Sequence, residues 1–313
     1  MLNRRQLRIK AMEIVYSFKD SSCNELEKHL EVFKNSTDKF YHLYIFILSF
    51  FVEFQNYCEE RLEISKKKYL EDKSFKFYSK ISKHLFLKKI SSDTFLKSQI
   101  DLFNINYWNE FPDHLEKIVK EIEHKNLFNH DDIKTNSDFE LQRKQVIAVF
   151  KKLVATDSKL YDYIEDSQLS WANDFALVNS LILSDLNRIN KKSSKSYLHK
   201  SIYKNKEDSN FGLKLVECNF SNEKLIENEI TEVVDNWDID RVAKIDMVLL
   251  KMCVSEFIYF ESIPIKVSIN EYLDMSKDYS SSKSNVFLNG ILDKLSKTLL
   301  ERGLINKNEK GSK

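Results

Sequence analysis

Apolar residues recur at helical spacing over residues 3–18 of the chain. On a wheel of 100° per residue, one face is apolar and comprises Leu7, Ala11, Ile14 and Phe18. The other face comprises Arg5, Arg8, Tyr16 and Lys19. A secretion signal also begins with cations, but it needs a continuous apolar core of about 7–15 residues, which Glu13 interrupts here. The pattern therefore predicts an amphipathic helix that belongs to the folded protein.

A second helix is predicted over residues 37–67, which are strongly apolar at the centre and charged at the end. Its most apolar run, residues 43–54, is far shorter than the roughly 20 residues that a membrane span needs, so a buried helix is expected. Shorter helices with polar joints follow, with a break at Pro112, and a further helical block covers residues 140–186. Residues 190–210 contain few apolar side chains and predict a linker.

The last part of the chain predicts three helices with clear boundaries. The first covers residues 240–260, and the second begins at Pro264, because proline suits the first turn of a helix. The second helix is expected to end near Tyr279. A serine-rich turn follows, in which Ser284 is the predicted N-cap of the last helix. Gly303 stands where a glycine that ends a helix is expected.

The last helix is predicted to be amphipathic, with an apolar stripe that comprises Phe287, Ile291, Leu295 and either Thr298 or Leu299. Gly290 lies in its middle, where glycine is less favourable than alanine. We therefore expect Gly290 to permit close packing against another helix.

The composition favours an all-α fold. The 313 residues include only 4 Gly and 2 Pro, which is too few for the many turns of an all-β or doubly wound fold. The 49 Lys+Arg and 48 Asp+Glu leave a net charge of +1, so any affinity for nucleic acid must come from a local patch. The 4 cysteines form no C-x-x-C pair, which favours reduced core cysteines in a cytoplasmic protein over disulfides or a zinc site.

Common catalytic motifs are absent from the sequence. It contains no H-E-x-x-H pair, no phosphate-binding glycine loop, and no G-x-S-x-G turn. Carboxylate pairs such as Glu59–Glu60 and Asp131–Asp132 lie in charged runs, which are typical of solvated surfaces. We therefore expect a binding protein rather than an enzyme, without a cofactor or a metal.

Two stretches near the C-terminus carry several short motifs in order, WDIDRVAKIDMVLLKMCVSEF (237–257) and SIPIKVSINEYLDMSKDYSSSKSNVFLNGILDKL (262–295). Here the chain resembles the bacterial transcription antitermination factor NusB, through Asp240–Arg241, Glu256, Ile263–Pro264, Lys266–Val267, Ile269–Asn270–Glu271 and Phe287–Lys294. The opening NRRQLRIKAMEIVYS is similar to the first helix of that family. Asn270 and Glu271 are interpreted as a structural polar pair.

The resemblance implies binding of RNA and protein without catalysis. NusB proteins bind a short single-stranded RNA element, boxA, through an arginine-rich first helix. They act with NusE, which is ribosomal protein ten of the small subunit, and join the RNA polymerase elongation complex with other Nus factors, chiefly on ribosomal RNA operons. Arginines neutralise phosphates and aromatic rings stack on bases, which agrees with that role.

The resemblance also implies which residues bind. The RNA-binding residues carried over are Arg4, Arg5, Arg8, Tyr16, Tyr279, Ser284 and Phe287. Asp246 and Lys283 map near the same surface as partner-binding or polar positions. Lys283 departs from the family, because many members have an acidic residue there. Lys10 lies off the basic stripe and is not assigned a role.

The predicted architecture consists of NusB-like helical bundles with an extra helical insertion between the first helices and the C-terminal bundle. The predicted domains are residues 1–67 with the basic RNA-binding start, 68–205 as an insertion of unknown function, 206–303 as the C-terminal bundle and 304–313 as a polar tail.

Two alternative functions stay open. A NusB-like fold can serve as a protein-interaction module that does not bind RNA, and the departure at Lys283 and the large insertion are compatible with it. Some ribosomal RNA cytosine methyltransferases carry a NusB-like domain, but at their N-terminus and before a catalytic domain with a glycine-rich loop. This chain has its NusB-like motifs at the C-terminal end and lacks such a loop.

Overall fold

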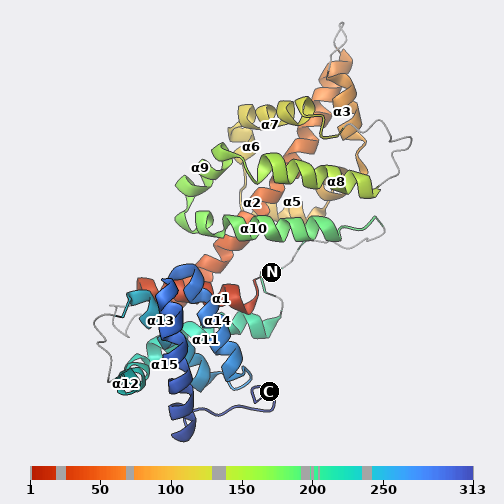
Figure 1. The fold of residues 1–313 in the computed structure, drawn as a ribbon. Helices are drawn as coiled ribbons and strands as arrows, with labels where there is room; N and C mark the ends of the chain where they lie inside the picture. The colour runs from red at the N-terminus through yellow and green to blue at the C-terminus, as the bar shows by residue number, and fades with distance from the viewer. Residues whose placement is uncertain are drawn as a thin grey trace. The chain divides into compact units, whose positions relative to one another are not determined.

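The computed structural model describes residues 2–18, 26–67, 74–128, 139–191, 198, 201–203, 205–234 and 242–312. Throughout these residues the regular elements are helices, and the only extended pairing is an isolated bridge between Leu2 and Tyr203 (Figure 1). The predicted all-α fold is confirmed. None of the described helices is long and apolar enough to cross a membrane.

The chain forms two compact units. Unit 1 comprises residues 1–37 and 201–313, and unit 2 comprises residues 38–200. These limits differ from the predicted domain limits at residues 67 and 205. The reason is that α2 (Leu26–Lys67) is one continuous helix that contributes its first turns to unit 1 and the rest to unit 2. The predicted linker over residues 190–210 lies partly outside the described residues, and α11 already begins at Lys206.

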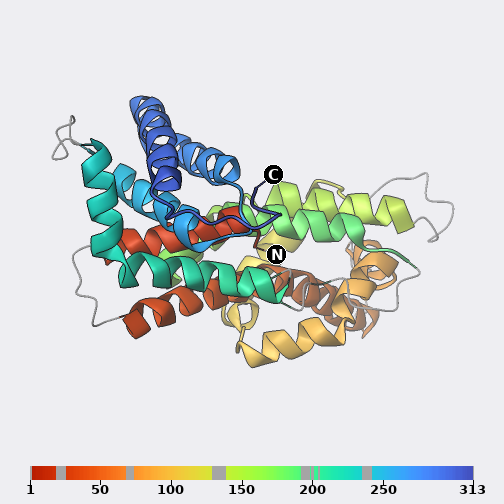
Figure 2. The same cartoon turned by 90° about the horizontal axis from the view of Figure 1, so that it is seen from below.

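Unit 1 joins the first helix to the C-terminal helices. Its helices besides the start of α2 are α1 (Arg4–Ser17), α11 (Lys206–Ser221), α12 (Glu223–Val234), α13 (Lys244–Tyr259), α14 (Ile265–Tyr279) and α15 (Ser282–Glu301). α1 packs against α11 and α13, and α13 also contacts α12, α14 and α15 (Figures 1 and 2). The first helix therefore packs on the C-terminal bundle although the insertion separates them in the sequence.

Helix α13 is the centre of unit 1. Its residues are buried on every side, including Leu249, Leu250, Met252, Cys253 and Val254 with no exposed surface. A helix that is apolar all round belongs in a core. The hydrophobic contacts of α13 with its five neighbouring helices, α1, α11, α12, α14 and α15, therefore organise the whole unit.

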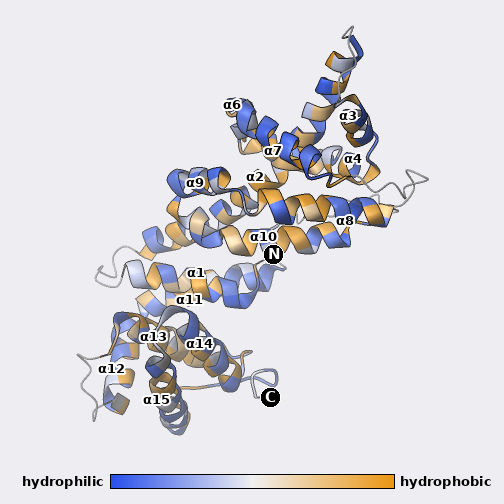
Figure 3. Cartoon of the chain, turned by 45° about the horizontal axis from the view of Figure 1, so that its top comes forward, coloured by the Kyte–Doolittle hydropathy of each residue, from blue (hydrophilic) through white to orange (hydrophobic). Residues whose placement is uncertain are grey.

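Unit 2 is built around the long apolar centre of α2. Its other helices are α3 (Phe75–Ser82), α4 (Leu85–Ser91), α5 (Thr94–Leu102), α6 (Tyr107–Glu110), α7 (Pro112–His124), α8 (Phe139–Val149), the π-helical turn η2 (Phe150–Val154), α9 (Ser158–Ser167) and α10 (Leu169–Arg188). Pro112 is the first residue of α7, which confirms the predicted break. Hydrophobic residues run along α2, α8 and α10, whereas α9 is mostly hydrophilic (Figure 3).

Two glycines of unit 1 differ in the space around them, and the difference predicts opposite effects of adding a methyl group. At Gly212 a Cβ atom would lie 2.3 Å from the ring of Phe33, which is fully buried, whereas at Gly290 it would meet no atom within 4 Å. Gly212→Ala is expected to destabilise the protein by about 1–3 kcal/mol through overpacking. Gly290→Ala is expected to stabilise α15 by about 1 kcal/mol. Urea unfolding of both variants measures the two values.

The expected destabilisation of Gly212→Ala would be contradicted if the two variants changed the urea unfolding midpoint of the wild type by the same amount. That result would show that the Phe33 ring moves aside at little cost.

Candidate nucleic-acid interface

The first helix begins at Arg4 because the preceding residue caps it. The side chain of Asn3 accepts a hydrogen bond from the backbone N–H of Gln6 at 3.0 Å, and the Gln6 side chain accepts one from the N–H of Asn3 at 2.7 Å. This reciprocal capping box satisfies backbone donors that a helix start leaves unpaired. It fixes the arginines in the first turns of α1.

Arg4 and Arg5 lie at the surface, each with about a third of the side chain exposed. Arg4 Nε donates to Asp208 Oδ1 at 3.0 Å, and its guanidinium lies 5.5 Å from the centre of the Phe211 ring. Arg5 pairs with two carboxylates of α14, which belong to Asp274 at 3.3 Å and Asp278 at 3.1 Å. Because exposed ion pairs are weak, a phosphate can replace these carboxylates at modest cost.

Arg8 is in a different environment, with only 3% of its side chain exposed. Its Nε and Nη2 donate to the two oxygens of Glu256 at 2.8 and 2.7 Å, and its Nη1 donates to Glu271 at 3.3 Å. The Glu256 carboxylate is fully buried and also accepts hydrogen bonds from Ser268 Oγ at 2.6 Å and Tyr272 OH at 3.2 Å. The network links α1 to α13 and α14.

The charges of this network are fixed by their contacts. Burial alone lowers the pKa of Arg8, but the hydrogen bonds and charge of Glu256 outweigh it, so the pKa is raised and the guanidinium stays charged. Burial and then the charge of Glu256 raise the pKa of Tyr272 well above its usual value, so its hydroxyl remains a donor. Arg8 thus faces the interior, unlike the surface position that the prediction assumed, and it fixes the position of α1. Glu271 pairs with Arg8 inside this network, which agrees with the structural role that the sequence predicts for Glu271.

Tyr16 lies in the last turn of α1 and is 48% exposed. It is 11 residues from Arg5, which at 1.5 Å per residue is about 16 Å along the helix. At 100° per residue this separation returns to the same side of the helix. Arg5 and Tyr16 therefore share a face of α1 but are about three turns apart. Lys10 is buried, in accord with its position off the basic stripe.

The junction between α14 and α15 carries the other predicted residues. Tyr279 ends α14 with 45% of its surface exposed, and it follows Asp278, to which Arg5 is paired. The N-cap of α15 is Ser281 rather than the predicted Ser284, because the Ser281 hydroxyl accepts from the backbone N–H of Ser284 at 3.2 Å. Arg5 and Tyr279 therefore lie near the same helix end.

Ser284 is buried inside the serine-rich turn. Its hydroxyl lies 2.9 Å from the Ser280 hydroxyl and 2.8 Å from the Ser281 hydroxyl. These contacts hold the turn together and leave Ser284 with 7% of its surface exposed. Lys283, the preceding residue, is exposed.

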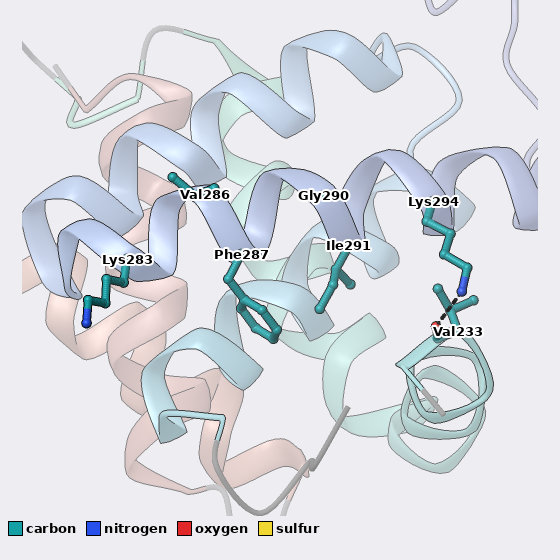
Figure 4. Close-up of a pocket in the computed structure, with 7 residues that line it drawn as sticks. All are labelled: Val233, Lys283, Val286, Phe287, Gly290, Ile291 and Lys294. Carbon is teal, nitrogen blue, oxygen red and sulfur yellow. Dashed lines mark hydrogen bonds between the residues drawn. The ribbon is translucent and has the colours of Figure 1, made fainter. Parts of the chain in front are cut away.

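Phe287 lines a groove of about 780 Å³ between α15 and the end of α12. The lining residues are Val233, Lys283, Val286, Phe287, Gly290, Ile291 and Lys294. Phe287 and Ile291 point to the same side of α15, and Lys294 donates to the carbonyl oxygen of Val233 at 2.9 Å (Figure 4). The groove is therefore mostly apolar, with a lysine near each end of its α15 side.

The groove corrects the interpretation of Gly290. No neighbouring atom lies within 4 Å of a Cβ built at Gly290, so this glycine does not serve close helix packing. It keeps the groove open instead. The prediction from sequence also missed Val286, which is 75% exposed. An exposed valine beside a phenylalanine and one turn from a glycine is the signal that could have indicated a groove.

Asp246 lies in the first turn of α13 and is only 3% exposed. Its Oδ1 has no hydrogen-bond partner in the described part of the chain. An acidic residue at a helix start interacts favourably with the helix dipole. The burial leaves little of this carboxylate for a partner. Across the described ranges, no group of three or more His, Cys, Asp or Glu side chains could hold a metal ion.

Residues 175–297 match the model of the NusB family. The transcription antitermination protein NusB of Chloroherpeton thalassium is 32% identical over 120 residues, which are 38% of this chain and 57% of the relative. That of Oleidesulfovibrio alaskensis is 39% identical over 95 residues, 30% of this chain and 61% of the relative. That of Natranaerobius thermophilus is 39% identical over 79 residues, which are 25% of this chain and 57% of the relative.

The chain thus spans less than two thirds of the length of these curated relatives. No solved structure matches it. The fold and the candidate surface define an all-α protein that gathers arginines and exposed aromatic side chains on one helical unit. Within this protein, residues 175–297 are similar to the NusB family, whose model they match.

Proposed function

We propose that this protein is a transcription antitermination factor that binds boxA-type single-stranded RNA on unit 1 and supports transcription of ribosomal RNA operons. The relatives that it resembles are transcription antitermination proteins. The observation that carries the proposal is the position of Arg4 and Arg5. Both are partly exposed at the start of α1, and Arg5 is paired with the residue next to the exposed Tyr279.

In this proposal each residue has a distinct role. Arg4 and Arg5 exchange their carboxylate partners for phosphates, which a guanidinium fork also binds through paired, charge-assisted hydrogen bonds. Tyr16, Tyr279 and Phe287 offer rings on which unpaired bases stack, a contact worth about 1–3 kcal/mol per base. Ser284 keeps the turn between Tyr279 and Phe287 in shape, as its hydroxyl contacts support. Arg8 is a positioning residue that holds α1 through Glu256.

The proposed partners are ribosomal protein ten of the small subunit (NusE) and, through it, the RNA polymerase elongation complex with other Nus factors. Lys283 is exposed at the start of α15 and is available to either RNA or protein. Asp246 is too buried for a direct contact, so we assign it to the stability of α13.

The first test is fluorescence anisotropy with a labelled boxA RNA from the ribosomal RNA leader of the host. Arg4→Gln with Arg5→Gln is expected to weaken RNA binding by about a hundredfold or more, since hydrogen bonds to charged groups contribute about 1.5–3 kcal/mol each. Addition of the ribosomal protein is expected to tighten binding of the wild-type protein. Lys297→Gln with Arg302→Gln removes the same charge from ion pairs made by α15 and its C-cap residue, and it serves as the matched control.

The salt dependence of the same titration separates the alternatives. Binding through phosphates weakens steeply with salt, whereas a mainly apolar protein interface changes little. If the Arg4–Arg5 variant and its control bound RNA with equal affinity, the result would show that RNA does not bind on α1. A folded protein that binds the ribosomal protein but no RNA would show that this fold serves protein contacts alone.

A further inference from the structure

Cations from three helices of unit 2 meet at the C-terminal end of α10. Lys89 of α4 donates to the carbonyl oxygen of Asn190 and, at 3.1 Å, to that of Lys191. Arg143 of α8 donates to the carbonyl oxygen of Asn187 at 2.9 Å. α8 packs against both α4 and α10, and it runs beside α10 in Figures 1 and 3. The start of α8, the helix α4 and residues 187–191 are therefore neighbours.

These segments carry an excess of positive charge. We call their six cations the basic end of unit 2, and they are Lys88, Lys89, Arg143, Lys144, Arg188 and Lys191. The carboxylates of α4, residues 139–145 and residues 185–191 are those of Glu140 and Asp185 alone. Glu140 pairs with Arg143, and Asp185 is buried and accepts a hydrogen bond from Tyr44 at 2.7 Å. No exposed carboxylate of these segments is left to balance the other cations.

Helix capping explains two of the six cations. Lys89 and Arg143 satisfy carbonyl oxygens at the end of α10, where positive charge also complements the helix dipole. Lys88, Lys144, Arg188 and Lys191 are exposed, and none of them pairs with a carboxylate in the part of the chain that the structure describes. Like charges that share a surface repel each other, and a bound polyanion removes that repulsion. Lys88 and Arg188 lie in the last turns of α4 and α10, where the helix dipole favours a cation, but that effect does not require four unpaired cations on one surface.

We propose that the basic end of unit 2 is a second RNA-binding surface, which contacts the phosphate backbone of RNA that flanks the element bound by unit 1. The aromatic rings of its segments, Phe86 and Phe139, are buried, so the surface offers charge and no ring on which a base can stack. Such a surface binds phosphates without reading sequence. This inference goes beyond the proposed function, which places RNA on unit 1 only, and it gives a role to the insertion.

RNA fits this surface better than an acidic protein does. An acidic protein surface presents separate carboxylates at fixed positions, whereas a flexible single strand presents a continuous row of phosphates that can follow cations contributed by three segments. Helix α7 of unit 2 provides a comparison for the basic end. Helix α7 places the exposed Lys117 and Lys120 among the acidic residues Asp113, Glu116, Glu121 and Glu123, so the same cation type there lies in a negative surrounding.

The experiment compares two RNAs and three double variants of the full chain. One RNA is the short boxA oligonucleotide, and the other is the same element with its natural leader sequence on both sides. The variants are Arg188→Glu with Lys191→Glu at the basic end, Lys117→Glu with Lys120→Glu on α7 as the matched control, and Arg4→Gln with Arg5→Gln on unit 1. Affinities are measured by anisotropy over a series of salt concentrations.

We expect the Arg188–Lys191 variant to bind the short RNA like the wild type and the long RNA about tenfold more weakly at low salt. The slope of log K against log salt should become shallower by about 1.4, because two phosphate contacts on a single strand contribute about 0.7 each. The α7 control should bind both RNAs like the wild type. Thermal unfolding checks that each variant is folded, and Lys88→Gln with Lys144→Gln is a milder second variant at the same surface.

The outcomes separate this inference from the proposed function. Weaker binding of the long RNA by the Arg188–Lys191 variant, with no effect of the Arg4–Arg5 variant, would support the second surface and refute RNA binding on α1. Long-RNA affinities of both basic-end variants equal to that of the α7 control would overturn the inference. It would also be overturned if these variants lost binding to the ribosomal protein and kept RNA binding, because the surface would then serve an acidic protein.

Discussion

Replacement of Arg8 by methionine is expected to destabilise unit 1 by about 3–5 kcal/mol, which is the typical cost when one partner of a buried ion pair is removed. Methionine fills much of the same space, so the loss comes from the Glu256 carboxylate. That carboxylate has no exposed surface and would keep only the hydroxyl donors of Ser268 and Tyr272. Hydrogen exchange of the α1 and α13 amides measures the effect within unit 1.

Two further variants identify the cause. Arg5→Met removes a cation from the same helix, but the Arg5 side chain is 35% exposed, so a loss below about 1 kcal/mol is expected. Arg8→Met combined with Glu256→Gln removes the unpaired charge and keeps a hydrogen-bond partner for both hydroxyls, because the amide oxygen accepts from one and the amide NH2 donates to the other. It should therefore be more stable than Arg8→Met alone. A double variant no more stable than the single variant would show that packing of the Arg8 stem dominates.

Arg8 also shows where sequence reasoning ends. The helical wheel correctly predicts α1 and its exposed Arg5 and Tyr16. It also assigns Arg8 to the polar face, because the wheel contains no information about a partner 248 residues later in the chain. The residue type gives no warning, since an arginine is rarely buried unless it is paired. Only the packing of α1 on α13 reveals that Glu256 is the partner.

The start of α2 was missed for a local reason. The predicted helix began at Thr37, after an Asn-Ser stretch of residues that often cap helices. In the structure α2 continues through them from Leu26. The Ser36 hydroxyl donates to the carbonyl oxygen of Phe33 at 2.9 Å and the Thr37 hydroxyl to that of Lys34 at 2.7 Å. Inside a helix, serine and threonine hydroxyls can satisfy their hydrogen bonds by donating to a carbonyl oxygen of the preceding turn. The sequence alone does not distinguish such a residue from an N-cap.

The α15 start has the same kind of ambiguity, since four serines surround it. Ser281 and Ser284 are both suitable N-caps, and the choice depends on where the chain turns after α14. Gly303, by contrast, was predicted correctly to end α15, and its φ of +70° is of the kind that glycine adopts most readily. Helix ends set by backbone geometry are thus easier to predict than those chosen among equivalent side chains.

Unit 2 is expected to lose stability as the pH falls from about 6.5 to 4, because of His84. This histidine is the N-cap of α4, where its Nδ1 accepts from the backbone N–H of Leu87 at 3.2 Å. Its Nε2 lies 3.4 Å from Gln145 Oε1, and the Gln145 amide is oriented by its bond to the Phe128 carbonyl oxygen. The neutral ring therefore carries its proton on Nε2. Protonation would place a second donor against the Leu87 N–H.

Burial, and to a smaller extent the charge of Lys80, lowers the pKa of His84 from 6.5 to about 4, against an opposing effect of Gln145. Because the folded pKa lies below the unfolded one, this stability is fully present above pH 6.5 and is lost as the pH falls toward 4. A shift of this size corresponds to at most roughly 3 kcal/mol. Urea unfolding in a Trp237→Phe background, followed by the fluorescence of Trp108 and Trp171, both in unit 2, measures the loss.

The variant His84→Asn isolates the contribution of this side chain. Asparagine is a good N-cap that does not titrate, so the variant should be less stable at neutral pH, where it lacks the contact of the ring with Phe128, yet much less sensitive to acid. His124→Asn changes an exposed histidine of α7 and should keep the pH dependence of the wild type. Carboxylates and His42 titrate alike in all three proteins, so their contribution cancels in the comparison. If His84→Asn kept the full acid sensitivity, the cap would not be the group whose protonation destabilises unit 2.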